Sequence, residues 1–142
     1  MTTGSAWLFS KAVTIAIRYS LVRRQFRDPD ADKSALERSV LSYPSVNRRL
    51  VPLIAKVYAF VAAGQRMQSL YNELSGQLAK GDMSLLADAH VASSALKAYV
   101  TKEVLVGVEE CRQALGGHGF SVYSGFNPIF AAAAPAVTFE GE

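Results

Sequence analysis

The sequence lacks several features that would place it in a specialised class. It has one cysteine in 142 residues, so no disulfide can form within the chain, and a reducing compartment is the default expectation. No apolar run reaches the roughly 20 residues of a membrane-spanning helix, so we expect no membrane span. Charged residues make up only 19%, below the roughly 25% that is typical of soluble domains. This low fraction indicates a surface that is partly covered by something else.

Basic residues are present but are not concentrated in one stretch. The formal net charge is +3, and the densest basic cluster is Arg23, Arg24 and Arg27. Nucleic-acid-binding domains usually carry longer basic runs with interleaved aromatic residues, so no nucleic-acid partner is expected. No group of His, Cys and carboxylate residues has the spacing of a metal site. We also find no targeting signal in this chain, neither a signal peptide nor a Ser-Lys-Leu address.

Apolar residues recur at steps of three and four along most of the chain, which is typical of helices. The pattern predicts three long helices, at about residues 5–24, 45–80 and 84–115. Ser5 is the expected N-cap of the first helix, and Pro52 should kink the second unless that helix begins later than residue 45. The expected fold is all-α, an up-down helical bundle of three long helices that forms an incomplete four-helix bundle.

The remaining segments give weaker patterns. The stretch from 25 to 44 contains two prolines and several acidic residues, and we interpret it as a surface connection with a short helical turn near 34–39. Residues 136–139 are the one place where an extended segment is suggested. No internal repeat is evident, so the chain reads as a single domain.

The most unusual stretch is "CRQALGGHGF", in which three of the four residues from Gly116 to Gly119 are glycine. Glycine costs backbone entropy, so such a cluster needs a reason. A helix C-cap explains the first of them. Three glycines following Gln113 indicate in addition that something approaches this backbone closely.

Four segments, in the same order and at similar intervals, resemble the C-terminal helical portion of the acyl-CoA oxidases, flavoenzymes related to the acyl-CoA dehydrogenases. They are "RYSLVRRQF", "LVPLIAKVYAF", "ECRQALGGHGFSVYSGF" and "PAVTFEGE". The resemblance covers essentially the whole chain. It implies that residues 1–142 form one helical domain, a fragment without the family's N-terminal helical region and β-domain.

The resemblance implies an activity as well. Acyl-CoA oxidases use FAD to convert acyl-CoA to trans-2-enoyl-CoA, and they pass the electrons to O2 to give hydrogen peroxide. The resemblance further implies a homodimer and a role in peroxisomal fatty-acid β-oxidation. Detailed features such as "ECRQALGGHG" and the long segment after "RRQF" favour an oxidase over an acyl-CoA dehydrogenase.

By the same resemblance, Glu140 in "TFEGE" is the catalytic base that removes a proton next to the thioester carbonyl. Such a Cα–H is a very weak acid, so the base must be positioned and the developing enolate oxygen needs hydrogen-bond donors. Gly141 would let the substrate approach the backbone and is therefore a substrate-binding candidate. From "EGE" alone, a solvated acidic pair is the simpler interpretation.

The resemblance also assigns two groups of residues to FAD. The first group, in the glycine-rich stretch, is Gln113, Gly116, Gly117 and Gly119, and in the family this stretch reaches across the dimer interface to the neighbour's FAD. The second group is Arg23 and Phe26 of "RRQF", where in the family the arginine contacts the FAD diphosphate. The family often has glycine after this phenylalanine, whereas this chain has Arg27. An ordinary basic helix C-terminus explains Arg23 nearly as well.

Two non-enzymatic alternatives stay open. The chain could be a truncated and inactive helical interaction module derived from this family, because much of a flavin site would lie in the missing β-domain. It could also be a helical adaptor unrelated to flavin. We expect the 142-residue chain by itself to bind FAD weakly and to lack turnover.

Overall fold

Helices make up most of the part of the chain that its structure, a computed structural model, describes, namely residues 2–139. Four α-helices follow one another along the sequence: α1 (Thr2–Val22), α2 (Pro44–Leu78), α3 (Leu86–Ala114) and α4 (Phe126–Ala133). Short 3-10 turns lie between α1 and α2, between α3 and α4, and after α4. Extended pairing within residues 2–139 is limited to one isolated bridge between Arg24 and Ser39. The predicted all-α class is therefore confirmed.

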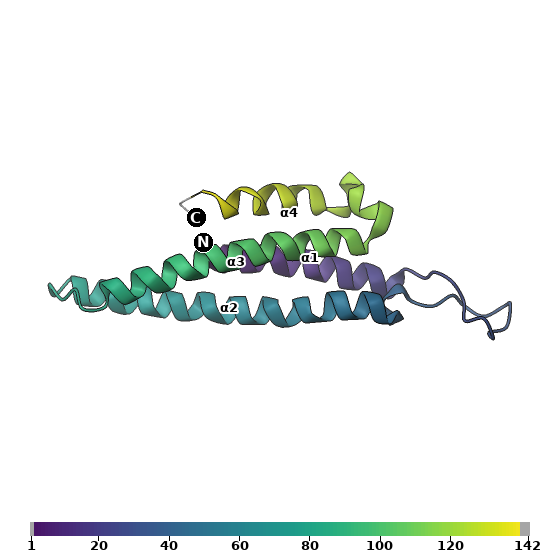
Figure 1. The fold of residues 1–142 in the computed structure, drawn as a ribbon, viewed down its shortest axis with the longest axis horizontal. Helices are drawn as coiled ribbons and strands as arrows, with labels where there is room; N and C mark the ends of the chain where they lie inside the picture. Colours follow the sequence, from purple (N-terminus) through teal and green to yellow (C-terminus); the bar gives the residue numbers. More distant parts are fainter. Residues whose placement is uncertain (1, 140–142) are drawn as a thin grey trace.

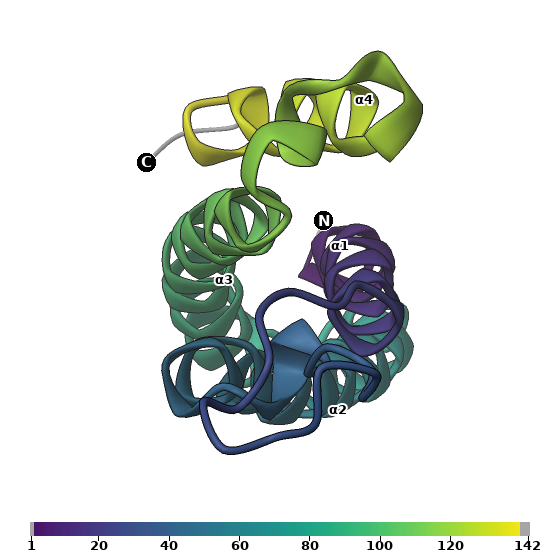
Figure 2. The same ribbon diagram turned by 90° about the vertical axis from the view of Figure 1, so that its right-hand side faces the viewer.

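The three long helices lie side by side as an elongated antiparallel bundle, and α4 lies along α3 (Figure 1). Seen along the bundle, α1, α2 and α3 form a triangle, and α4 covers the side of α1 and α3 that faces away from α2 (Figure 2). The connection between α1 and α2 extends beyond one end of the bundle (Figure 1). The glycine-rich turn after α3 lies at that same end.

The predicted long helices are present, with corrections at their ends. The N-cap prediction at Ser5 is wrong, because α1 already begins at Thr2 and Ser5 is a buried residue inside it. Helix α2 runs through Pro52, which lies within its continuous Pro44–Leu78 span. The other boundaries differ from the predicted ones by a few residues, as expected when helix ends are read from patterns.

A fourth helix, α4, was not predicted. It follows Gly125, which has a left-handed φ of +76° and ends the preceding turn. Pro128 lies in the first turn of α4, where a backbone N–H would have no partner within the helix. Phe126, Ile129 and Ala133 are its buried residues. The helix has only eight residues, so its hydrophobic periodicity is too short to distinguish it from a loop. The sequence "GFNP" at its start is also typical of a turn.

Two local predictions also need correction. The prediction of an extended segment at 136–139 is wrong, because a 3-10 turn, Pro135–Val137, covers its first part. The helical turn expected near 34–39 is found a few residues later, as the 3-10 turn Val40–Ser42. Each turn is closed by a short-range backbone hydrogen bond, from Ser42 N–H to the Ser39 carbonyl in one and from Thr138 N–H to the Pro135 carbonyl in the other. Hydrophobic periodicity does not predict such bonds.

The core lies between the helices and takes buried residues from α1, α2, α3 and α4. Phe9 of α1 is fully buried, and its ring lies 6.3 Å from the ring of Phe60 on α2. Phe60 in turn makes an edge contact with Tyr99 of α3. Gly107 of α3 lies directly against Phe9, and a Cβ at position 107 would collide with that ring. A residue without a side chain therefore allows α1 and α3 to approach closely here.

None of the helices between residues 2 and 139 has the length and hydropathy needed to cross a membrane. In that range, no group of three or more His, Cys, Asp or Glu residues is arranged to hold a metal ion.

Candidate functional site

The glycine-rich stretch folds as a tight 3-10 turn, Gly116–Phe120, directly after α3. Gly116 has φ of +59°, in the left-handed region that favours glycine, so the predicted stop of the helix here is confirmed. At Gly116 and Gly117, an added Cβ would meet no atom within 4 Å. The outer side of this glycine turn is therefore bare backbone that faces open space.

Gly119 has a different environment from the other two glycines. It is buried, and a Cβ at this position would collide with the backbone carbonyl oxygen of Arg112. Backbone cannot swing aside as a long side chain can. Gly119 therefore allows the turn to pack against the end of α3, whereas Gly117 leaves the turn accessible.

This contrast gives a matched pair of substitutions. Gly119→Ala is expected to lower the free energy of unfolding by about 1–3 kcal/mol, the usual range for overpacking. Gly117→Ala is the control and should change it by less than about 0.5 kcal/mol, as at other surface sites. Urea unfolding followed by circular dichroism measures both. Equal losses for the two variants would contradict the packing assigned to Gly119.

Arg23 and Phe26 lie just beyond the end of α1. The backbone N–H of Arg23 donates to the Tyr19 carbonyl at 2.8 Å, and the Arg23 side chain is exposed. Phe26 is 68% exposed and has φ of +62°. A bulky residue in this left-handed region is strained. The left-handed residue of this turn is thus Phe26 itself, so the turn does not depend on a glycine at position 27.

Tyr19 and His118 connect these two elements. The Tyr19 hydroxyl lies 3.0 Å from Nδ1 of His118, and the two rings are 5.5 Å apart. Tyr19 is on the last turns of α1, and His118 is inside the glycine turn. The hydrogen bond therefore places the Arg23–Phe26 segment and the glycine turn at one end of the bundle, although 99 residues separate the two partners.

Gln113 is held at both ends of its side-chain amide. Its Nε2 donates to Glu109 at 2.9 Å, and its Oε1 accepts from Arg49 of α2 at 3.4 Å. Arg112 donates two hydrogen bonds to the same Glu109 carboxylate, and these bonds lower the pKa of Glu109 to about 2. Gln113 is thus oriented by neighbouring charges while its side chain stays exposed.

A hollow of about 520 Å³ lies beside the glycine turn, between α3 and α4. It has two charged side chains, Glu109 and Arg112, and two aromatic side chains, Phe120 and Phe130. Phe120 is 82% exposed. Gly116, Gly117 and Gln113 do not line this hollow, although they lie at the same end of α3. Open backbone, an oriented amide and an arginine are groups that can bind a diphosphate.

The two remaining predicted site residues, Glu140 and Gly141, lie outside the described residues. The last described residue is Phe139, which follows the 3-10 turn after α4. Helix α4 runs from the glycine turn toward the opposite end of α3 (Figure 1). The six predicted FAD-binding residues therefore occupy one end of the described structure, and the described chain ends away from them.

Sequence reasoning missed several residues of this end. Tyr19, Arg49, Glu109 and Arg112 were not assigned a role, and His118 in the glycine-rich stretch is interpreted from the sequence as a hydrogen-bonding spacer in preference to a proton shuttle. Arg112 and Glu109 could have been paired from their three-residue spacing on a helix. The contact of Tyr19 with His118, and that of Arg49 with α3, depends on how the helices pack.

Comparison with known proteins decides the family. The model of the acyl-CoA oxidase C-alpha1 domain matches residues 1–142. The chain belongs to the acyl-CoA oxidase family. It is 42% identical, over its full length, to acyl-coenzyme A oxidase acox-1.1 of Caenorhabditis elegans. It is also 42% identical over 139 residues, 98% of the chain, to peroxisomal acyl-coenzyme A oxidase 1 of Rattus norvegicus.

Solved oxidase structures share the fold. Acyl-CoA oxidase-1 of Caenorhabditis elegans, complexed with FAD and ATP, superposes with a TM-score of 0.93 at 42% identity over the whole chain. Arabidopsis thaliana acyl-CoA oxidase 1 superposes with a TM-score of 0.89 at 38% identity over 99% of the chain. The match spans only 21% of the length of either of these two proteins, and 21% of each of the two relatives above.

Proposed function

We propose that these residues form the C-terminal helical part of an FAD-dependent acyl-CoA oxidase that converts acyl-CoA to trans-2-enoyl-CoA and reduces O2 to hydrogen peroxide. The support is family membership together with the meeting of two elements at one end of the bundle. The single observation that carries the cofactor assignment is the Tyr19–His118 hydrogen bond, because it joins the Arg23–Phe26 segment to the glycine turn.

The residues at this end fit an FAD diphosphate. Gly116 and Gly117 offer backbone that a ligand can approach, since no neighbouring atom lies within 4 Å of an added Cβ. The guanidinium of Arg23 would donate paired hydrogen bonds to phosphate oxygens. Gln113 would present an amide whose orientation Arg49 and Glu109 fix. When bound, FAD would supply the acceptor for the hydride from the substrate and the route of electrons to O2.

The proton chemistry is assigned to Glu140. Its carboxylate would remove a proton from the carbon next to the thioester carbonyl, while the neighbouring carbon loses a hydride. The backbone N–H of Glu140 would donate to the carbonyl oxygen of the thioester, where negative charge develops. Gly141 would leave room for the substrate beside this backbone. The role of each residue rests on its place in the "TFEGE" motif.

We further propose a homodimer and a peroxisomal location. The FAD-binding elements and the last described residues lie toward opposite ends of α4 (Figure 1), which favours their use in two different flavin sites, one of them on the partner. Relatives from Rattus norvegicus and Arabidopsis thaliana are named peroxisomal oxidases, and this supports the same compartment.

The 142-residue chain and a polypeptide that adds the rest of an oxidase give different expected results. Purified with added FAD, the chain alone should be nearly colourless and release no peroxide from palmitoyl-CoA, because the matched domain is about a fifth of its relatives. The longer polypeptide should be yellow and produce peroxide. A colourless and inactive longer polypeptide would reject the proposed function and favour a helical interaction module. A yellow, active 142-residue chain would show that FAD binding and turnover do not require the other four-fifths of the oxidase relatives' length.

A further inference from the structure

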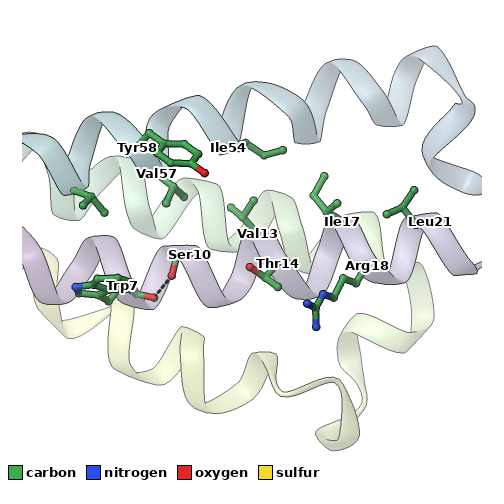
Figure 3. Close-up of a pocket in the computed structure, with 11 residues that line it drawn as sticks. Trp7, Ser10, Val13, Thr14, Ile17, Arg18, Leu21, Ile54, Val57 and Tyr58 are labelled. Carbon is green, nitrogen blue, oxygen red and sulfur yellow. Dashed lines mark hydrogen bonds between the residues drawn. The ribbon is translucent and has the colours of Figure 1, made fainter.

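An apolar groove runs along the bundle between α1 and α2, on the side away from α3 (Figure 3). Its volume is about 560 Å³. Val13 and Ile17 of α1 point toward α2, where Val57 lies near Val13 and Ile54 lies nearer to Ile17, whereas Thr14 and Arg18 lie along the edge of α1 away from α2 (Figure 3). The groove is separate from the glycine turn, and none of the six proposed FAD-binding residues lines it.

The groove is about as long as a short helix, and large apolar side chains are exposed along it. Its lining on α1 runs from Trp7 to Leu21, which corresponds to about 21 Å of helix. Trp7 is 59% exposed, Leu21 52% and Tyr58 74%. A single acyl chain could not cover three large side chains that are spread along both helices. An amphipathic helix lying in the groove would cover them, because such helices bury side chains at steps of three and four.

The charges around the groove have one sign. Helix α1 contains no Asp or Glu, and its charged residues are Lys11 and Arg18. Helix α2 has no acidic residue before Glu73. Its Arg49 and Lys56 form ion pairs with Glu110 and Glu103 of α3. Arg49 and Lys56 are therefore occupied on the α3 side, and the one charged side chain among the described residues that line the groove is Arg18, with no carboxylate in that lining.

This charge pattern indicates the occupant. A second copy that used the same face would place the Lys11 and Arg18 edges together without an opposing carboxylate, and such like-charge contacts are costly. An acidic partner would instead meet Arg18 with opposite charge. We propose that the groove binds an amphipathic helix of about four turns, with an apolar stripe and glutamate or aspartate residues along its flanks. This inference does not depend on the flavin site.

Trp7 provides the measurement, because it is the single tryptophan of the chain and lines the groove. The probe is a synthetic 18-residue amphipathic peptide with a leucine and alanine stripe flanked by glutamates. The matched control peptide has lysine at each glutamate position. At low salt, the acidic peptide should shift Trp7 emission to the blue and bind at least about tenfold more tightly than the lysine peptide, and added salt should weaken it.

Two arginine variants locate the binding. Arg18→Glu should weaken the acidic peptide about tenfold and strengthen the lysine peptide, since the charge at the edge of the groove is reversed. Arg66→Glu makes the same charge change on α2 outside the groove lining and should stay within about twofold of the parent chain. Circular dichroism checks that both variants remain helical.

Several results would overturn the proposal. These are absence of binding by the acidic peptide, equal binding of the two peptides, and equal effects of Arg18→Glu and Arg66→Glu. A blue shift that grows with protein concentration alone, together with dimers in sedimentation, would assign the groove to a second copy. A shift caused by palmitate that blocks the acidic peptide would assign it to an acyl chain.

Discussion

Glu140→Gln, in a polypeptide that supplies the rest of the oxidase, should slow the formation of trans-2-enoyl-CoA by a factor of about 100 to 10,000, the usual contribution of a general base. Glutamine keeps the size of the side chain and removes its ability to accept the Cα proton. Binding of acyl-CoA and of FAD should change little, because the backbone N–H at position 140 is retained. Single-turnover bleaching of the flavin absorbance by palmitoyl-CoA measures this step directly.

Glu142→Gln is the matched control for this experiment. It makes the same chemical change two residues away, at the position that follows the glycine of the motif. We expect its bleaching rate to stay within about threefold of the parent rate, as for a residue outside the reacting atoms. If Glu140→Gln bleached at the parent rate, Glu140 would not be the base. If Glu142→Gln alone were slow, the base would be Glu142.

The second large effect is expected in the core, at Gly107. A Cβ at this position collides with the ring of Phe9, which is fully buried and packed against Phe60. Because the ring has no space to move into, Gly107→Ala should force α1 and α3 apart. We expect the free energy of unfolding to fall by about 1–3 kcal/mol, measured by urea denaturation of the 142-residue chain.

Gly76→Ala is the control for Gly107→Ala. Gly76 is also inside a long helix, but a Cβ there would meet no atom within 4 Å. Alanine should therefore stabilise the chain by about 0.5–1 kcal/mol, the difference in helix propensity. Combining Gly107→Ala with Phe9→Leu should recover part of the loss, because the smaller side chain leaves room for the new methyl group. Stabilisation by both alanine substitutions would contradict the close approach of α1 and α3.

Much of the fold could be predicted from the sequence. The periodicity of α1, α2 and α3 extends over 21 to 35 residues each, which is long enough for an apolar stripe to be recognised. Helix α4 was missed because its eight residues give only two helical turns, and because Gly125 and Pro128 are typical of a turn. The glycine after α3 was interpreted correctly as a stop, since Gly116 adopts the left-handed conformation.

The candidate site was predicted in part. The motifs identified Gln113 and the glycines as one segment and Arg23 with Phe26 as another. They did not show that the Tyr19–His118 contact brings the two segments together. They also gave no reason to distinguish Gly119, which is packed against the Arg112 backbone, from Gly117, which is open.

The sequence by itself determined the all-α class, the three long helices and the family, because periodicity and motif order are properties of the linear chain. Tertiary structure alone decided which faces of those helices stay uncovered and which distant residues meet. The apolar stripe of α1 looks continuous in the sequence, yet α2 and α3 cover only part of its circumference. The groove between α1 and α2 remains for that reason, since a helix buries a side only where another element packs against it.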